Sequence, residues 1–454
     1  MDIIDRVSQK ICADGIPVFM VGGCVRDFFR GVDPCDVDLV TPASPEQIVT
    51  ALSSLSGIKF DLVGSSFGVI MVKDLHNQET VEIATYREDI STGPKHSDFN
   101  VNFIDNIEGD LARRDLTINA LAQCVVTGDI VDPHGGFEDI RNKVIKFVGV
   151  PDDRIIEDPL RMLRAGRFLS LLDGYIDRES FNAIKRNAKL VKTIPGERIR
   201  AEILKSVKTA KYASRFFYLM AETGILEYIL PSLAECFEFP HGHHHLEDVF
   251  DHSMIVGDAI SVKYPLVKLA GYLHDIGKPA AYIKNGGLNF FQHDKIGAKL
   301  LKDELTDLRF SVDEITFIVG LVRHHMGLSN DASPKAIRRK LQNLDQDRIS
   351  FRDFLRLRIA DRYGNLKKTP FTGTYVKDFV RLFIENRKAP TKTSELSVNG
   401  HDIMAHLDIG PGPIVGNILG HLLDVVIENP EYNVKEVLLQ LSENKLLNQN
   451  KIVV

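Results

Sequence analysis

The chain has 454 residues, of which 44% are hydrophobic and 26% are charged, and its formal net charge is −6. This length is too great for one compact core, so we expect about three or four domains, and the composition excludes a disordered or fibrous protein. The acidic balance argues against a protein that coats nucleic acid indiscriminately. Residues 334–394, however, hold 16 Lys and Arg against 6 Asp and Glu, and such a basic segment can bind a polyanion locally.

Cysteine usage and hydropathy predict the compartment. Five cysteines, without a Cys-x-x-Cys pair, fit neither a disulfide framework nor a zinc ribbon and are typical of a reducing environment. Residues 1–6 include an early acid and lack the apolar run of a signal peptide, and no later segment offers about 18 continuous apolar residues. We therefore expect a cytoplasmic protein that does not insert into a membrane.

A glycine pair follows the first predicted strand. Apolar residues recur at helical spacing over residues 3–13, and a buried strand is expected over 16–21. Gly22 and Gly23 come next and open a helix whose first turn carries Arg26. Paired glycines let the backbone approach a ligand, and the N–H groups at a helix start, together with an arginine, are suited to bind a triphosphate.

Asp36 and Asp38 lie in a second predicted strand, over residues 35–40. Because alternate side chains on a strand point to the same face, both carboxylates would project together. Two close carboxylates repel each other unless cations lie between them, and Mg²⁺ prefers carboxylate oxygens together with substrate phosphates. The pattern predicts a phosphoryl- or nucleotidyl-transfer site; the alternative is a pair of solvated acids at a strand end.

Two further strands are expected over residues 69–73 and 80–86. The second strand carries Glu82, which the alternation of side chains makes the natural third carboxylate of the same site. Residues 87–106 lack periodicity and predict a mobile loop.

Arg113 and Arg114, bracketed by Asp110 and Asp115, open a helix expected over residues 110–122. Adjacent arginines are costly to bury without partners. They therefore either form a structural ion network or contact the sugar and phosphates of a nucleotide.

These motifs together resemble the class II tRNA nucleotidyltransferase and bacterial poly(A) polymerase family, which belongs to the DNA polymerase β-like nucleotidyltransferases. The resemblance covers roughly the first 210 residues and rests on Gly22-Gly-Cys-Val-Arg-Asp27, Asp36-x-Asp38, Arg113-Arg-Asp115, Asp132…Gly136…Asp139 and Glu157-Asp-Pro-Leu-Arg161-Met-Leu-Arg164-Ala.

The resemblance implies roles for individual residues. Asp36 and Asp38 would bind Mg²⁺ and, with Glu82, form the catalytic set. Nucleotide binding would fall to Gly22, Gly23, Arg26, Asp110, Arg113, Asp158, Arg161, Arg164 and Arg167. Asp158 and Arg161 would imitate a template base, because a carboxylate accepts from the exocyclic amine of C or A and a guanidinium donates to ring acceptors. By spacing alone, residues 157–167 would line one helix face and could equally form salt bridges there.

Histidines crowd the region that follows, from His241 to His325. The order His252, His274-Asp275 and Asp361 resembles the HD phosphohydrolase superfamily. Imidazoles with carboxylates suit Mn²⁺, Fe²⁺, Ni²⁺, Zn²⁺ or, less well, Mg²⁺, and a bound metal would lower the pKa of a water that attacks a phosphoester.

Other histidines near this motif are further candidates. His293 and one of His324 or His325, with His324 the first choice, are candidate ligands of a second ion. Residues 241–245 are expected to form a His-rich surface loop or a lid. Basic side chains over residues 338–362 are expected to meet phosphates from one helix face while apolar ones pack.

The two resemblances imply an α+β chain in four parts. A small N-terminal nucleotidyltransferase head, with a DNA polymerase β-like mixed sheet and helices, would occupy residues 1–147. An all-α neck would follow over 148–235, an HD metal-dependent phosphohydrolase domain over 236–365, and a helical tRNA-binding tail over 366–454.

The favoured hypothesis is a template-independent enzyme that adds CCA to tRNA 3′ ends from CTP and ATP by two-metal catalysis. Its HD site would act on a phosphate at an RNA end, such as a 2′,3′-cyclic or a 2′-phosphate, or would have lost hydrolysis. The alternatives are a poly(A) polymerase or an enzyme that adds only CC or A. Gly93-Pro94-Lys95-His96 replaces the basic pair expected in CCA-adding relatives. A third hypothesis is an HD phosphohydrolase whose N-terminal half binds RNA.

Overall fold

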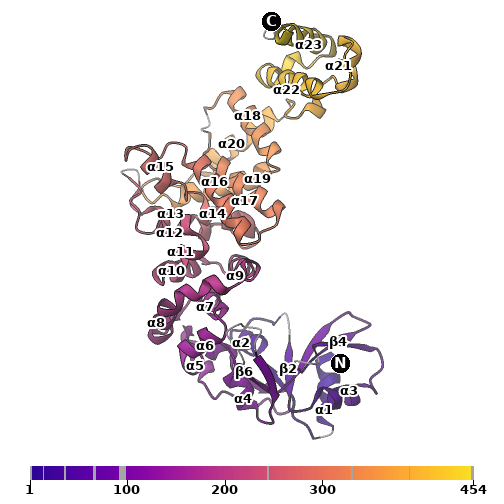
Figure 1. The fold of residues 1–454 in the computed structure, drawn as a ribbon, viewed down its shortest axis with the longest axis vertical. Helices are drawn as coiled ribbons and strands as arrows, with labels where there is room; N and C mark the ends of the chain where they lie inside the picture. Colours follow the sequence, from indigo (N-terminus) through magenta and orange to yellow (C-terminus); the bar gives the residue numbers. More distant parts are fainter. Residues whose placement is uncertain are drawn as a thin grey trace. The chain divides into compact units, whose positions relative to one another are not determined.

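A computed structural model gives the fold (Figure 1). It describes residues 3–13, 15–34, 37–64, 68–91, 99–242, 245–328, 331–387 and 389–450. The chain forms two compact units, Met1–Leu230 and Pro231–Val454.

A seven-stranded mixed sheet forms the centre of the first unit, in the order β3-β4-β5-β2-β1-β8-β9. Strands β2 and β5 pair in parallel, and the other neighbours are antiparallel. The strands are β1 (Phe19–Val21), β2 (Asp38–Thr41), β3 (Ile58–Gly64), β4 (Val69–Asp74), β5 (Thr80–Thr85), β8 (Ala122–Cys124) and β9 (Ile130–Val131).

Helices α1 (Ile3–Cys12) and α3 (Pro45–Leu52) pack against one face of this sheet, where Leu39 and Ile83 are buried. A capping box at Ser44 starts α3 where the sequence predicts it. The opposite face packs Val21, Val40 and Tyr86 against α4 (Ile107–Ala112). Since side chains alternate along a strand, Asp38 and Glu82 belong to this second face.

Two predictions for residues 87–122 are wrong. Residues 87–91 and 99–103 pair as β6 (Arg87–Ser91) and β7 (Phe99–Phe103), while the Gly93–His96 stretch lies outside the described residues. Instead of one long helix, α4 ends at Ala112 and a 3₁₀ turn, Thr117–Asn119, follows. Asp115 Oδ1 accepts hydrogen bonds from Leu116 N and Asn119 Nδ2, and such local bonds compete with helix continuation.

Residues 157–167 do not share one helix face, because the helix is interrupted. Helix α6 (Pro151–Glu157) ends before Asp158, and α7 (Leu160–Leu172) begins after Pro159. A residue that precedes proline is disfavoured in the helical region, and Asp158 has φ −145° and ψ 100°. The first unit also contains α2 (Gly23–Phe29), α5 (Gly136–Asn142), β10 (Val144–Ile145), β11 (Tyr175–Ile176), α8 (Arg178–Asn187), α9 (Gly196–Thr209), α10 (Ser214–Glu222) and α11 (Leu226–Ile229).

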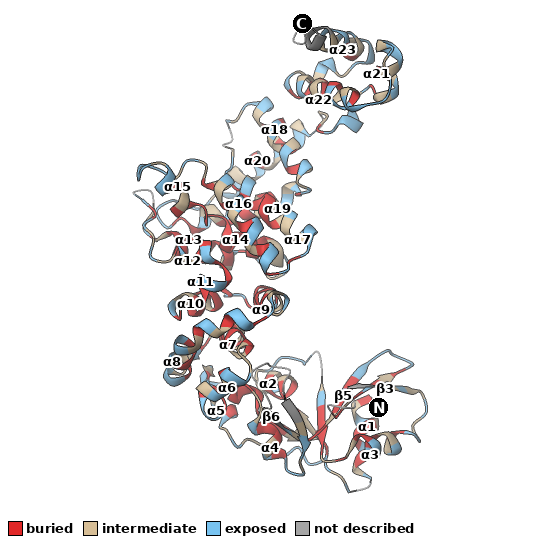
Figure 2. Ribbon diagram, in the orientation of Figure 1, coloured by how far each residue is buried: buried red, intermediate tan, exposed pale blue. Residues whose placement is uncertain are grey.

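The second unit is helical. Helices α13 (Val249–Ala259), α14 (Pro265–Leu273), α16 (His293–Asp307), α17 (Val312–His324) and α19 (Phe351–Gly364) surround a buried core (Figure 2). The remaining helices are α12 (Pro231–Ala234), α15 (Lys278–Lys284), α18 (Pro334–Gln346), α20 (Gly373–Asn386), α21 (Gly400–Leu407), α22 (Pro413–Glu428) and α23 (Lys435–Asn450). The last three share a separate small core.

The predicted fold class is confirmed: a mixed sheet with helices precedes a helical remainder. No helix among the described residues is long and apolar enough to cross a membrane. The four cysteines that the structure describes form no disulfide.

Candidate functional site

Asp38 and Glu82 lie side by side on the sheet of the first unit. In the parallel pair of β2 and β5, Asp38 is the register partner of Glu82, and Val21 of β1 is the antiparallel partner of Asp38. Register partners project to the same face, so the two exposed carboxylates share it, next to the end of β1 that leads into Gly22. Asp36 lies outside the described residues.

Arg26 is held in place by a chain of buried contacts. Gly22, with φ 73°, turns the chain from β1 into α2. Arg26 is 7% exposed, and its Nη1 donates to Asn119 Oδ1 at 2.7 Å. Asn119 Nδ2 donates to Asp115 Oδ1 at 3.1 Å, and Arg164 Nε donates to Asp115 Oδ2 at 2.6 Å. The helix that follows the glycine pair is therefore tied to the Arg-Arg-Asp motif and to α7.

Three predicted nucleotide-binding arginines surround the ring of Phe168. The guanidinium carbons of Arg26, Arg164 and Arg167 lie 4.8, 5.6 and 4.0 Å from the ring centroid. Arg167 Nε also pairs with the buried Glu202 at 2.6 Å. Arg164 and Arg167 are thus engaged in ion pairs with buried carboxylates, and they position this part of the site.

The adjacent arginines form the structural ion network. Asp110 is fully buried, and its two oxygens lie 2.8 Å from Arg113 Nη2 and 3.1 Å from Arg114 Nη2. Arg161 Nη2 donates to the carbonyl of Arg113 at 3.1 Å. Asp110, Arg113 and Arg161 are therefore brought together.

Asp158 occupies the break between α6 and α7, and its carbonyl oxygen accepts a hydrogen bond from Arg161 N at 3.0 Å. Its Oδ1 accepts from Leu160 N at 3.1 Å, and its Oδ2 accepts from Arg198 Nη2 at 3.1 Å. Arg161 Nη1 pairs with Glu157 at 2.7 Å. The contact of Arg198, on α9, with Asp158 was not predicted, since nothing in local spacing connects the two residues.

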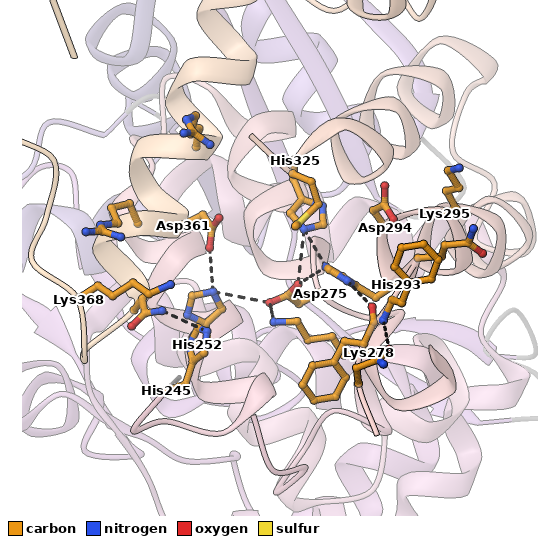
Figure 3. A pocket seen from close by; sticks show the side chains of 18 of the residues that line it. His245, His252, Asp275, Lys278, His293, Asp294, Lys295, His325, Asp361 and Lys368 are labelled. Atoms are coloured by element: carbon orange, nitrogen blue, oxygen red, sulfur yellow. Dashed lines mark hydrogen bonds and ion pairs between the residues drawn. The ribbon is translucent and has the colours of Figure 1, made fainter. Parts of the chain in front are cut away.

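The predicted HD residues gather in the second unit around Asp275 (Figure 3). Each of the two carboxylate oxygens of Asp275 faces a different pair of histidines. Oδ2 lies 3.1 Å from His274 Nε2 and 3.7 Å from His252 Nε2. Oδ1 lies 3.3 Å from His293 Nε2 and 3.6 Å from His325 Nε2. Asp275 therefore stands between two groups of imidazoles, as a bridging carboxylate would.

Asp361 of α19 completes the first group. Its Oδ1 lies 3.1 Å from His252 Nε2 and 3.7 Å from His274 Nε2.

Gly277 allows α15 to approach α16 closely, because a Cβ there would lie 2.1 Å from the carbonyl oxygen of His293.

His325, and not His324, joins the second group. His324 Nε2 lies 2.8 Å from Asp347 Oδ2, away from the cluster. Consecutive helical residues point about 100° apart, so only one of the pair can face the cluster. The assignment of His324 as a candidate ligand is corrected accordingly.

Backbone carbonyls orient three of the imidazoles. The Nδ1 atoms of His274, His293 and His325 each bond to the carbonyl oxygen three residues earlier, at Gly271, Phe290 and Val322, at 2.8, 2.9 and 2.6 Å. A carbonyl only accepts, so each Nδ1 carries the proton and each Nε2 presents its lone pair to the cluster.

The electrostatics of the cluster keep its carboxylates ionised. Burial works to raise the pKa of Asp361, but the hydrogen bond with His252 and the nearby His274 hold this pKa well below its usual range. Burial, followed by the proximity of His274 and His293, lowers the pKa of His325 to about 3. Burial opposes protonation of His252, but Asp361 and Glu247 outweigh burial and raise its pKa to about 9.

The His-rich segment before α13 is not a surface loop. His241 and Glu247 are buried, and the rings of His241 and His245 stack with centroids 3.4 Å apart. His245 Nδ1 lies 2.6 Å from Glu247 Oε1. His243 and His244 lie outside the described residues. The crowding of histidines next to α13 was the available signal for this arrangement.

The residues present fit a divalent ion. His274 Nε2 is buried and has no hydrogen-bond partner among the described residues, although it faces two carboxylates. Three overlapping groups bring potential ligand atoms within 4.8 Å of one another: His241/His245/Glu247/His252, His252/His274/Asp275 and Asp275/His293/His325.

A cavity of about 900 Å³ opens over this cluster. Its wall carries the cations Lys278, Lys295, Arg358, Arg362 and Lys368 and the aromatic residues Phe290, Phe291, Phe371 and Tyr375. The size lies within the range of small-molecule sites. Cations beside a metal-binding cluster suit a phosphorylated ligand.

Family models match four stretches of the chain. They are described as "Poly A polymerase head domain" (residues 18–146), "Probable RNA and SrmB- binding site of polymerase A" (175–237), "HD domain" (242–365) and "tRNA nucleotidyltransferase domain 2 putative" (375–441).

Individual proteins are also similar to this chain. The A-adding tRNA nucleotidyltransferase of Deinococcus radiodurans is 30% identical over 423 residues, 89% of this chain and 90% of that protein. The CCA-adding enzyme of Ligilactobacillus salivarius is 39% identical over 199 residues, 44% of this chain and 47% of that protein, so the match spans about half of each. The solved structure of Bacillus stearothermophilus CCA-adding enzyme in complex with CTP is 25% identical, with a TM-score of 0.68 over 99% of this chain and 100% of that one. The chain therefore belongs to the class II tRNA nucleotidyltransferase and poly(A) polymerase family with an HD domain, and it is an RNA 3′-end nucleotidyltransferase.

Proposed function

We propose that this chain completes the 3′ ends of tRNA with CCA, using CTP and ATP. The observation that carries this proposal is the register pairing of Asp38 with Glu82 beside the Gly22 turn. It gathers two carboxylates at the place where the strand, the glycine pair and Arg26 could receive a triphosphate. CCA-adding enzymes are similar to this chain in sequence and in structure.

Asp36 and Asp38 would hold two Mg²⁺ ions, with Glu82 assisting one of them. When bound there, Mg²⁺ supplies Lewis-acid activation of the RNA 3′-hydroxyl and neutralises charge on the triphosphate. The 3′-hydroxyl loses its proton to solvent, its oxygen forms a bond with the α-phosphorus, and the bond to pyrophosphate breaks. The backbone of Gly22 and Gly23 and the guanidinium of Arg26 hold the triphosphate in line for this displacement.

Base selection falls to Asp158 and Arg161. Asp158 Oδ1 accepts from Leu160 N and Oδ2 accepts from Arg198 Nη2, which orients the carboxylate, and a carboxylate is an acceptor that suits an exocyclic amine. C and A carry such an amine beside a ring acceptor, whereas G and U present the reverse pattern. Two incoming nucleotides can thus be selected without a template.

A second candidate, addition of the terminal A alone, is favoured by one observation. One relative that matches nearly the whole chain is an A-adding enzyme. A poly(A) polymerase is the third candidate, and Poly(A) polymerase I of Haemophilus influenzae is 30% identical over 326 residues.

The decisive experiment supplies purified protein with tRNA that lacks all three terminal nucleotides and with tRNA that lacks only the last. Incorporation of two C followed by one A supports CCA addition. Extension of only the second substrate, by one A, supports A addition and overturns our proposal. Long A tracts on any RNA support a poly(A) polymerase.

We further propose that the HD cluster hydrolyses a phosphoester at an RNA 3′ end, such as a 2′,3′-cyclic or 2′-phosphate. His252, His274, Asp275 and Asp361 would hold one ion, and His293, His325 and Asp275 a second. A bound metal supplies an activated water for attack on phosphorus. The cations of the 900 Å³ cavity would receive the phosphate.

Two variants separate the two activities. Asp275→Asn should abolish the opening of a terminal 2′,3′-cyclic phosphate to a phosphomonoester, and the release of phosphate from a terminal 2′-phosphate, and it should leave nucleotide addition intact. Asp38→Asn should abolish nucleotide addition and leave this hydrolysis intact. If wild type adds no nucleotide to the tRNA substrates while Asp38→Asn keeps phosphoester hydrolysis, the chain is instead an HD phosphohydrolase with an RNA-binding first half. If wild type neither opens the cyclic phosphate nor releases phosphate from the 2′-phosphate end, the HD proposal is rejected.

A further inference from the structure

His241 faces the same oxygen of Asp275 as two of the predicted metal ligands. Its Nε2 lies 3.6 Å from Asp275 Oδ2, while those of His252 and His274 lie 3.7 and 3.1 Å from this atom. All three imidazole side chains are 1% exposed. Three ring nitrogens from separate parts of the chain therefore converge on one carboxylate oxygen.

The contact with Lys278 indicates which nitrogen of His241 carries the proton. Lys278 Nζ hydrogen-bonds to His241 Nε2 and lies 2.6 Å from Asp275 Oδ2. An ammonium group only donates, so Nε2 accepts and the proton lies on Nδ1. Nδ1 itself is buried without a hydrogen-bond partner in the part of the chain that the structure describes. His241 thus turns its Nε2 lone pair toward the ammonium group of Lys278, which lies beside Asp275. A metal ligand turns its lone pair toward an ion in the same way.

His245 and Glu247 hold His241 and His252 in these orientations. The ring of His245 lies against that of His241, with an interplanar angle of 23°. Glu247 Oε1 lies 2.6 Å from His245 Nδ1 and 3.3 Å from His252 Nδ1. The carboxylate of Glu247 therefore hydrogen-bonds the ring beside His241 and lies within ion-pair distance of the rear of His252, whose Nδ1 has no hydrogen-bond partner among the described residues.

This anchoring distinguishes His252 from the imidazoles that bond to backbone carbonyls. A carboxylate behind a ligating histidine fixes its tautomer and raises its basicity as a ligand. If Glu247 held another ion, that ion would bind His252 Nδ1 while the first ion binds Nε2, and His252 would have to be an imidazolate. Glu247 is therefore better placed as an orienting group than as a ligand of another ion.

We propose that His241 is a fifth ligand of the ion held at Asp275 Oδ2, and that Glu247 is the positioning residue of this centre. The ligand set is then three imidazoles and two carboxylates: His241, His252, His274, Asp275 and Asp361. Such a set selects a borderline ion such as Mn²⁺, Fe²⁺, Ni²⁺ or Zn²⁺ over Mg²⁺. This inference rests on the HD metal centre proposed above.

Titration with Co²⁺, followed by its visible absorption, tests the assignment on the full chain. His241→Phe keeps a ring against His245 but removes both nitrogens. His274→Phe is the positive comparison, and His324→Phe is the matched control, because His324 bonds to Asp347 outside the cluster. We expect His241→Phe to weaken Co²⁺ binding at least about tenfold and to change the spectrum, and Glu247→Gln to weaken it about tenfold, while His324→Phe matches wild type.

The outcomes separate failure of the inference from failure of the metal centre. If His241→Phe titrates like His324→Phe, with the wild-type spectrum, His241 is not a ligand. If His274→Phe also titrates like wild type, the centre itself is rejected.

A second measurement applies if His241→Phe does not fold. In the Co²⁺-loaded protein carrying His293→Gln, which removes one of the two imidazoles of the other group, proton NMR with ¹⁵N-labelled histidine counts the ring N–H groups close to the ion. Three strongly shifted histidine N–H resonances from the centre at Oδ2, beyond any from His325, support the inference. Two overturn it.

Discussion

Glu82 stands opposite Asp38 in the parallel pair of β2 and β5, although α3, β3 and β4 separate the two residues in the chain. Side chains of register partners point to the same face of a sheet and lie within reach of a shared ion. The position of Glu82 is therefore set by sheet topology, and its charge can be removed without changing the strand.

Glu82→Gln should lower the rate of nucleotide addition roughly 10²-fold, in the range found when one charge-stabilising group is removed from an active site. The amide has the same shape but cannot neutralise a cation. Single-turnover incorporation of CTP measures the effect. Glu79→Gln, an exposed position just before β5, is the matched control and should leave the rate unchanged. A rate for Glu82→Gln within twofold of wild type would remove Glu82 from the catalytic set.

The strand that carries Glu82 could be predicted because its two faces differ. Val81 and Ile83 are buried and Glu82 is exposed, so alternation in the sequence reports the orientation. The break at Asp158 was also readable, since Pro159 disfavours helix at the preceding residue. We nevertheless expected one continuous helix face, because the spacing of acids and arginines mimics helical periodicity.

Other contacts had no local signal. Arg198 lies 40 residues from Asp158, and their ion pair follows from the packing of α9 against α7. His324 and His325 are chemically identical, and only the rotation of α17 decides which one reaches His293. The chain order of an HD motif specifies the ligand types but not the neighbouring segment that brings His241 and Glu247 inward.

Removal of the carboxylate at residue 158 should relax base selection. In Asp158→Ala, discrimination against UTP and GTP should fall by about 1–3 kcal/mol, or roughly 5- to 150-fold, the value of one good base contact. Arg198→Ala should act in the same direction but less strongly, because Arg198 orients Asp158 through its 3.1 Å bond. Competition between CTP and UTP on one tRNA substrate measures this ratio. Asp153→Ala, an exposed acid on α6, is the control; equal selectivity in Asp158→Ala and in the control would contradict the role of Asp158.

Asp115 should make the first unit sensitive to acid. Burial opposes its ionisation, but Arg164 and the bond from Asn119 outweigh burial and lower the pKa of Asp115 to about 2. Because this folded-state pKa lies below the usual value of 3.8, the stabilisation is fully present above about pH 4 and is lost as the pH falls toward 2. It amounts to about 2 kcal/mol.

Asp115→Asn should therefore flatten the pH dependence of local stability between about pH 4 and 2. At neutral pH the variant should lose about 3 kcal/mol, because Arg164 is left without its partner. Hydrogen exchange of residues 107–124, followed by mass spectrometry, measures local stability in the full chain. An unchanged acid profile in the variant would show that Asp115 does not carry this stabilisation.

Arg338 joins α18 to the end of α22. The sequence predicted that this side chain would contact phosphates, but it is engaged within the protein instead. It is 8% exposed, and its guanidinium donates to the carbonyl oxygens of Ile427, at 2.6 Å, and Glu428, at 3.0 Å. These are among the last carbonyls of α22, which have no partner within the helix.

Arg338→Ala should leave them unpaired and lower the stability of α22 by about 2 kcal/mol, seen as faster hydrogen exchange over residues 413–428. Arg339→Ala is the matched control, because Arg339 is exposed and pairs with the Glu428 side chain at 3.2 Å, a surface pair worth at most about 1 kcal/mol. Equal exchange in the two variants would mean that the buried contacts of Arg338 do not hold α22 in place.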